Sequence, residues 1–215
     1  MKPPKLKLIT EFSDVEWIHK MLYPFEEEYF TRLGIHIPIG YESYLTIRHH
    51  NLDPYKANLG FLIWEKLILL LRDYTETPER CIAGIWNGFG WDFESTYPDL
   101  FRENSNSLLL KKSNLFENFF QLPYRSYYLV EADILDTLKI GYIRFNSFRL
   151  EIPNLLWPSD KSWFVVNEID YDVTLLGGSE NMIREIENSH FFATERFDPT
   201  IPNRDIFLAD WPPQE

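Results

Sequence analysis

The sequence is almost without cysteine, and this scarcity excludes several classes of protein. Cys81 is the only cysteine among 215 residues, so no disulfide can form within the chain. Paired-cysteine spacings and the H-E-x-x-H motif are also absent, so we expect no metal site and no cofactor. Cys81 lies in the apolar run CIAGIW, which indicates a small core residue rather than a nucleophile.

Basic residues are scarce relative to acidic ones. The chain has 21 Lys and Arg against 33 Asp and Glu, which gives a formal net charge of −12. Nucleic-acid binding depends on neutralising phosphates, so neither nucleic acid nor an anionic membrane is an expected partner. A basic protein is the partner class that this charge favours, because opposite net charge speeds encounter. Plain solubility would explain the charge equally well.

No long apolar run is present. The most apolar stretch, FLIWEKLILLL, is too short to span a bilayer and contains Glu65 and Lys66. The first residues, MKPPKLKLITEF, lack the continuous apolar region of a secretory signal. We therefore expect a cytoplasmic protein.

The familiar catalytic motifs are missing as well. Neither the nucleophile elbow G-x-S-x-G nor the phosphate-binding glycine patterns occur. His49 and His50 are adjacent, and on a strand they would point to opposite faces, so they cannot bind one zinc ion together.

Aromatic residues, in contrast, are abundant. They make up 17 % of the chain, which is enough apolar surface for a stable core. Helical and strand patterns mix without βαβ regularity, which favours an α+β fold: one domain over residues 1–215, with a mainly antiparallel sheet flanked by helices. We expect a surface insertion at 94–122 and a loop-like tail from residue 194.

Local patterns predict the individual elements. Ser13 and Glu16 have capping-box spacing and predict the start of a helix, and Asn87-Gly88 predicts a hairpin turn after a strand. The other predicted elements are strands at 41–50 and 81–86, helices at 24–34 and 61–74, a strand and short helix at 126–139, and a strand pair at 141–152.

The stretch WFVVNEIDYDVTLLGGSENMI is the most informative part of the sequence. If it begins as a strand, Glu168, Asp170 and Asp172 share one face, while the apolar residues face the core. Ser179 is then expected to cap a helix after a tight turn at Gly177-Gly178. The simplest interpretation is a solvated acidic face at a strand–turn–helix corner. The alternative is a site for acid–base or divalent-cation chemistry.

Several blocks of the chain resemble a family of bacterial proteins, mainly from Gram-positive genomes, whose function is not assigned. The blocks are IGYESYLTIRHH, CIAGIWNGFGW and PNLLWPSDKSWFVVNEIDYDVTLLGGS. The family's early segment resembles Y-x-R-x-x-H-P, and this chain has Thr46 in place of the arginine and His50 in place of the proline. The resemblance implies a common fold and no particular activity.

Three functional hypotheses follow. The first is a non-catalytic protein-binding module, most specifically an immunity-type inhibitor of a bacterial toxin. Its expected contact residues are Glu26, Glu27, Glu28, Asp170 and Asp172. The second is a carboxylate-dependent hydrolase using Glu168, Asp170 and His49, with or without a divalent cation. The third is a structural or regulatory domain with an unspecified partner.

Overall fold

The computed structural model describes residues 6–24, 33–49, 60–87, 119–123, 125–144 and 147–202. Three predictions lie wholly or mostly outside these residues. They are the helix after Pro24 with its acidic residues Glu26, Glu27 and Glu28, the second arm of the hairpin at Asn87-Gly88, and residues 94–118 of the expected insertion.

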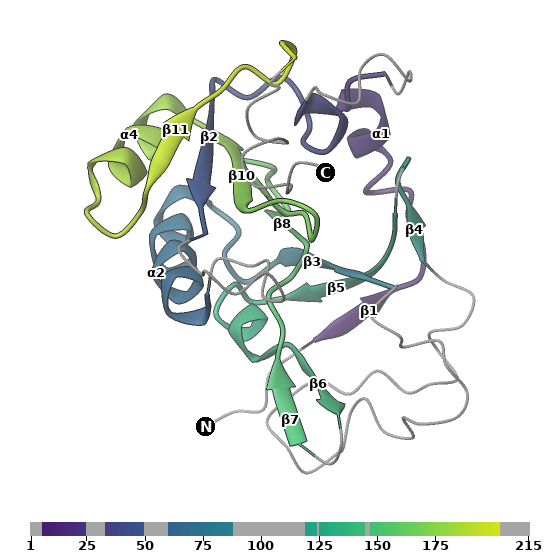
Figure 1. The fold of residues 1–215 in the computed structure, drawn as a ribbon. Helices are drawn as coiled ribbons and strands as arrows, with labels where there is room; N and C mark the ends of the chain where they lie inside the picture. The colour runs from purple at the N-terminus through teal and green to yellow at the C-terminus, as the bar shows by residue number, and fades with distance from the viewer. Residues whose placement is uncertain are drawn as a thin grey trace, which may run out of the picture.

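A nine-stranded antiparallel sheet dominates the described part of the chain (Figure 1). Its order is β1-β5-β3-β8-β9-β10-β2-β11, with the short β4 also paired to β5. The strands are β1 (Lys7–Ile9), β2 (Ser43–Arg48), β3 (Cys81–Trp86), β4 (Phe120–Gln121), β5 (Ser126–Ala132), β8 (Leu155–Pro158), β9 (Phe164–Asn167), β10 (Val173–Gly178) and β11 (Thr194–Arg196). The α+β class predicted from the sequence is confirmed.

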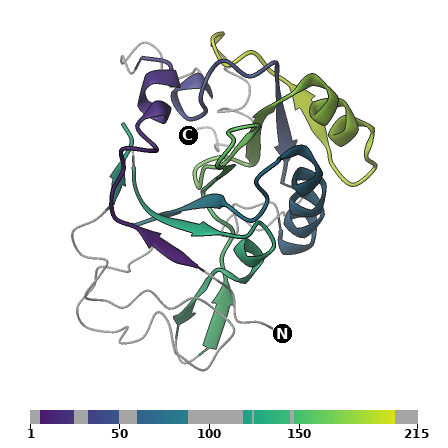
Figure 2. The ribbon, with the colours of Figure 1, turned by 180° about the vertical axis from the view of Figure 1, so that it is seen from behind.

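The sheet is strongly twisted. In Figure 1 the strands β1, β5 and β3 run roughly crosswise to β10 and β2, and Figure 2 shows the same change of direction from behind. A separate hairpin pairs β6 (Gly141–Arg144) with β7 (Ser147–Leu150), as the sequence predicted. It projects beyond the sheet in both views.

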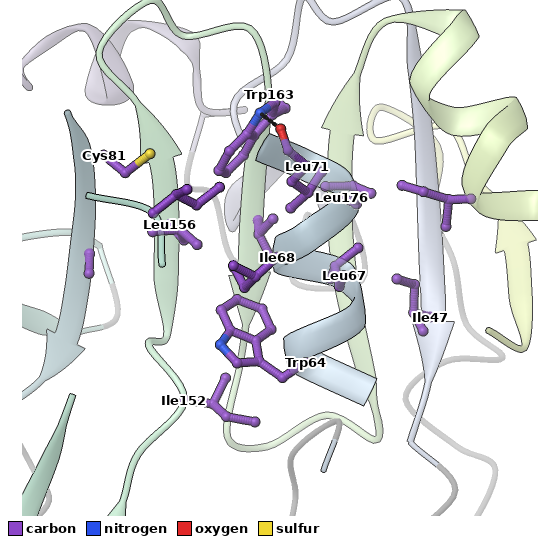
Figure 3. Close-up of a cluster of buried hydrophobic side chains, with 14 of the residues drawn as sticks. Ile47, Trp64, Leu67, Ile68, Leu71, Cys81, Ile152, Leu156, Trp163 and Leu176 are labelled. Carbon is purple, nitrogen blue, oxygen red and sulfur yellow. Dashed lines mark hydrogen bonds between the residues drawn. The ribbon is translucent and has the colours of Figure 1, made fainter. Parts of the chain in front are cut away.

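Two helices cover one face of the sheet. They are α2 (Phe61–Leu71), continued by the 3-10 turn η3 (Arg72–Tyr74), and α4 (Glu180–Asn188). Trp64, Leu67 and Ile68 of α2 are fully buried against the strands (Figure 3). The indole nitrogen of Trp163 donates a 3.1 Å hydrogen bond to the carbonyl of Leu71, which ties the last turn of α2 to the sheet.

The opposite face is covered by the N-terminal part of the chain. The short helix α1 (Trp17–Met21) and the 3-10 turn η2 (Leu33–Ile35) lie over it. Ile18 and Leu33 are fully buried there against aromatic residues that include Trp157 and Phe164. The sheet therefore has apolar cores on both faces, which is why its central strands are apolar without alternation.

Some elements differ in detail from their predictions. The helix α1 begins at Trp17, with Glu16 at the N-cap and no side-chain cap, so the capping box expected at Ser13 does not form. A turn occupies residues 13–16 instead, with the amides of Val15 and Glu16 donating to the carbonyl of Phe12.

The expected insertion and tail also differ where they are described. At the end of the expected insertion, Phe120 and Leu122 are buried, so this part belongs to the core. The tail from residue 194 begins as strand β11, which pairs with β2 before the chain becomes irregular at Phe197. Pairing with a free sheet edge gave these three polar residues an extended conformation that no apolar pattern indicated.

One further helical segment follows the sheet strand β5. The 3-10 turn η4 (Asp136–Lys139) follows β5, as the strand-then-helix pattern predicted.

The first and last strands of the sheet order, β1 and β11, are only three residues long. Short edge strands offer few unpaired backbone groups to other chains.

Candidate functional site

The acidic residues of the predicted site do not share a strand. Strand β9 ends at Asn167 and β10 begins at Val173, so Glu168, Asp170 and Asp172 lie in the connection between the two strands. The amide of Tyr171 donates to the carbonyl of Glu168 and closes a turn there. The prediction of a common acidic face was wrong, because the strand stops before its first acidic residue.

The predicted glycine turn was wrong as well. Gly177 and Gly178 belong to β10, where a Cβ on Gly177 would lie 2.7 Å from the ring of Tyr41 and 2.9 Å from that of Tyr44. These glycines therefore make room for neighbouring side chains. Ser179 is confirmed as the N-cap of α4, because its hydroxyl accepts a hydrogen bond from the amide of Met182.

Glu168 is the buried member of the acidic group. Its side chain is 4 % exposed, and one carboxylate oxygen accepts hydrogen bonds from Nε of Arg125 at 2.6 Å and from the amide of Ile169 at 2.9 Å. Burying a carboxylate without a partner is very costly, so the guanidinium is what makes this position tolerable for Glu168.

Arg125 connects the buried carboxylate to the surface. Its Nη2, which also lies 2.6 Å from Glu168, donates a hydrogen bond to Asp170, whose side chain is 72 % exposed. The guanidinium lies 4.7 Å from the ring of Trp86. Burial alone would lower the pKa of Arg125, but the hydrogen bond and charges of Glu168 and Asp170 raise it. We call Arg125, Glu168, Asp170 and Trp86 the arginine cluster.

His36 and Tyr171 pack beside the arginine cluster. Nε2 of His36 lies 2.7 Å from the hydroxyl of Tyr171, and Nδ1 lies 4.0 Å from Glu168. Burial, and secondarily the charge of Arg125, lowers the pKa of His36 to about 3. The order carboxylate, imidazole and hydroxyl is that of a catalytic triad, but the 4.0 Å step is too long for a hydrogen bond.

An imidazole with so low a pKa is also a poor general base near neutral pH. Tyr171 is only 8 % exposed, which leaves little room for a substrate at its hydroxyl. The arginine cluster, His36 and Tyr171 thus form an ion-paired group that holds the β9–β10 connection in place. Their geometry does not match that of a reaction centre.

The side chain of His49 bonds to Thr174 rather than to an acidic residue. Its Nε2 is 2.9 Å from the hydroxyl of Thr174, which donates its single proton to Asn167. Nε2 must therefore be the donor, and Nδ1 is left as a buried acceptor without a partner among the described residues. Burial lowers the pKa of His49 to about 4. The network continues through Asn167 to Asn154.

The hydrolase hypothesis requires His49 to meet the carboxylates, and the fold separates them. His49 and Thr174 lie on the face covered by α2 and α4, since Ile47 and Leu176 belong to that core. Glu168 instead contacts His36, which precedes the buried Ile37 of the opposite core. The residues next to His49 and those next to Glu168 thus belong to the cores on opposite faces of the sheet.

Asp170 and Asp172 are both exposed. The side chain of Asp170 bonds to Arg125, and the carbonyl of Asp172 accepts a hydrogen bond from the amide of His49. The turn that carries these two acids is thereby held on both sides. Glu26, Glu27 and Glu28, the other predicted contact residues, lie outside the described residues.

Metal chemistry finds no support in the described part of the chain, where no three His, Cys, Asp or Glu side chains are grouped to hold an ion. Cys81 is buried and unpaired, and burial raises the pKa of its thiol well above its ordinary value. A thiol with a raised pKa is a weak nucleophile.

Sequence reasoning did not find Arg125 or His36. Arg125 precedes Glu168 by 43 residues, and His36 precedes Tyr171 by 135. No local pattern relates residues so far apart. The one available signal was chemical, since a carboxylate flanked by apolar residues has to find a cation when it is buried.

Comparison with known proteins returned no matching family model, no matching curated protein and no matching solved structure. The resemblance to a bacterial family thus stays a prediction. None of the described helices combines the length and the hydropathy that crossing a bilayer requires.

Proposed function

We propose that this protein is a non-catalytic binding module that presents the β9–β10 turn to a basic protein partner. The observation that carries the proposal is the arrangement around Arg125. The buried pair with Glu168 anchors the turn, while Asp170 and Asp172 are exposed on it. A turn held in place beforehand loses little conformational entropy when it binds, which favours affinity.

Charge supports the same class of partner. The chain carries a net charge of −12, and the guanidinium that pairs with the exposed Asp170 also lies over the aromatic ring of Trp86. Aromatic and charged residues next to one another are typical of binding hot spots. The most specific form of the proposal is an immunity-type inhibitor whose basic partner is a bacterial toxin.

The hydrolase hypothesis is weaker on the same geometry. Glu168 is held by a guanidinium, Asp170 is exposed, and His49 lies on the other face of the sheet. None of the three is placed to exchange a proton with another. No described feature favours the structural or regulatory alternative specifically.

The test is binding to the product of a toxin gene that neighbours this gene. We expect the purified partner to bind at low salt, with affinity falling as salt rises. The double change Asp170→Asn and Asp172→Asn should weaken binding about tenfold in calorimetry, because two charge contacts are lost.

The matched control removes two exposed acids at the other end of β3, by Glu76→Gln and Glu79→Gln. This variant has the same net charge as the test variant and should bind like the unaltered protein. Equal losses in both variants would mean that only net charge matters. The absence of any neighbouring toxin, together with no basic partner in affinity capture, would overturn the proposal.

A further inference from the structure

The outward side of α2 carries leucines that the fold does not bury. The inward side of this helix packs on the strands (Figure 3), whereas Leu62 and Leu69 are 74 % and 49 % exposed. These leucines are seven positions apart, which is nearly two helical turns, so they form one line along the outer side. Phe191, 54 % exposed, lies beside this line, because the ammonium of Lys66 is 3.6 Å from its ring. Exposed apolar side chains grouped in this way mark interaction sites.

Four exposed charges border the leucine line: Glu65, Lys66, Arg72 and Asp73. At about 100° per residue, Glu65 and Arg72 lie on one flank of the line, and Lys66 and Asp73 lie on the other. Each flank therefore carries one acid and one base, and their order along the helix is opposite on the two flanks. In the described part of the chain, none of the four forms an ion pair.

This arrangement of charges is complementary to a second copy of itself. When two copies of α2 lie side by side in the same direction about a two-fold axis, each flank meets the opposite flank of the other helix. Glu65 then faces the partner subunit's Lys66, and Arg72 faces the partner subunit's Asp73. Flanking charges pair across parallel coiled coils in a similar way. The leucines of the line face their own copies.

The opposite direction of pairing is less complete. Two antiparallel copies of α2 centred on Leu69 would also bring Glu65 to the partner subunit's Arg72. Only Leu69 would then meet a leucine, and Leu62, the more exposed of the two, would be left without an apolar contact. The parallel arrangement covers both leucines and pairs all four charges.

The overall charge of the chain also favours a second copy at this face over a charged partner of another kind. Two chains that each carry a net charge of −12 repel one another over most of their surfaces. The outer side of α2 is locally neutral, with two acids and two bases. A partner of one charge sign would meet as many like charges as opposite ones there, whereas a second copy meets an opposite charge at each position.

We propose that the outer side of α2 is the contact of a weak homodimer, in which two copies of the helix lie side by side in the same direction. A stable interface buries about 800 Å² on each subunit, more than three partly exposed side chains can supply, so the association should depend strongly on concentration. The face shares no residue with the β9–β10 turn. The inference therefore stands apart from the proposed function.

The experiment is sedimentation equilibrium of the purified protein at physiological salt, from about 10 μM to about 1 mM. We expect a monomer–dimer equilibrium in this range. The double change Leu62→Ser and Leu69→Ser should leave only monomer, with an unchanged melting temperature, because both side chains are exposed. The control is Ile201→Ser, which removes an apolar side chain that is 57 % exposed away from α2 and should dimerise like the unaltered protein.

A charge swap tests the parallel arrangement itself. Glu65→Lys should weaken the dimer about tenfold, because the two-fold axis turns two ion pairs into two like-charge contacts. Adding Lys66→Glu to this variant should restore the dimer, since the pair is then reversed rather than lost. Glu79→Lys changes the net charge by the same amount as Glu65→Lys at an exposed position outside α2, and it should not weaken association.

Three outcomes would overturn the inference. They are a monomer over the whole concentration range, a dimer that survives the loss of both leucines, and a charge swap that fails to restore association in a variant with the parent's melting temperature. Antiparallel helices would give the last result. The double change of Asp170 and Asp172 should leave the dimer intact, and no toxin is needed for these measurements, so failure of the dimer and failure of the β9–β10 turn are distinguishable.

Discussion

At the scale of single residues, Arg125 is the group on which the described site depends. It satisfies a carboxylate that is 4 % exposed and also holds the exposed Asp170. Such a pair contributes little net stability compared with apolar residues of the same size. Removing only one member, however, leaves an uncompensated buried charge.

We therefore expect Arg125→Met to destabilise the protein by about 3–5 kcal/mol in urea unfolding, because Glu168 loses its cation. The double variant Arg125→Met with Glu168→Gln should recover much of this loss. Arg80→Met serves as the control, since Arg80 is 60 % exposed and its pair with Glu131 is worth about 0–1 kcal/mol. A loss for Arg125→Met no larger than that of the control would contradict the anchoring role.

At the scale of elements, the starts of α1 and α4 have different causes: a side-chain cap at α4 and tertiary packing at α1. Ser179 and Ser13 both precede helical segments and both looked like N-caps. Only Ser179 accepts a hydrogen bond from its helix, whereas α1 begins after Glu16 without a side-chain cap. The helix α1 is set in place by the burial of Ile18 rather than by its first turn.

Ser179→Ala should accordingly lower the free energy of unfolding by about 1 kcal/mol, because the amide of Met182 loses its acceptor. Ser13→Ala should change it by less than about 0.5 kcal/mol, as surface changes away from such features do. Urea unfolding of both variants, with unfolding slopes compared to the parent, measures the difference. Equal losses of unfolding free energy at the two positions would show that the hydrogen bond from the amide of Met182 to Ser179 does not stabilise α4.

At the scale of the whole molecule, partly buried titratable groups make stability depend on pH in two opposite ways. Burial lowers the folded pKa of His36 to about 3 and of His49 to about 4, so their contribution is present above about pH 6.5 and is lost as the pH falls. Burial raises the pKa of Glu151 from 4.5 to about 7, so its contribution is present below pH 4.5 and is lost as the pH rises through 7.

Glu151→Gln isolates the second effect. The neutral amide removes the cost of ionising a partly buried acid, so the variant should exceed the parent in stability by about 1–3 kcal/mol at pH 8. Near pH 4.5 the two proteins should be almost equally stable. Urea unfolding between pH 4 and pH 8 measures this, with the exposed Glu79→Gln as a control that should show no such trend. A constant difference across the range would contradict the assignment.

The sequence by itself determined the class of fold and most of its elements. Apolar runs and their lengths predicted β2, β3, β5, α2 and α4, because burial on one or two faces leaves a local pattern. The exposure of Asp170 and Asp172 was also predicted, since the chemistry of a carboxylate keeps it in water unless it is paired.

Only the tertiary structure decided where the acids lie and what holds them. Strand β9 stops just before Glu168, whose side chain is buried against Arg125. A contact between residues so far apart in sequence leaves no local pattern. The assignment of Gly177 and Gly178 to a strand followed from the space taken by Tyr41, Tyr44 and Met182. Strands distant in sequence, such as β3 and β8, became neighbours in the sheet. Pairings of this kind are set by packing of the whole sheet, which no short stretch of sequence contains.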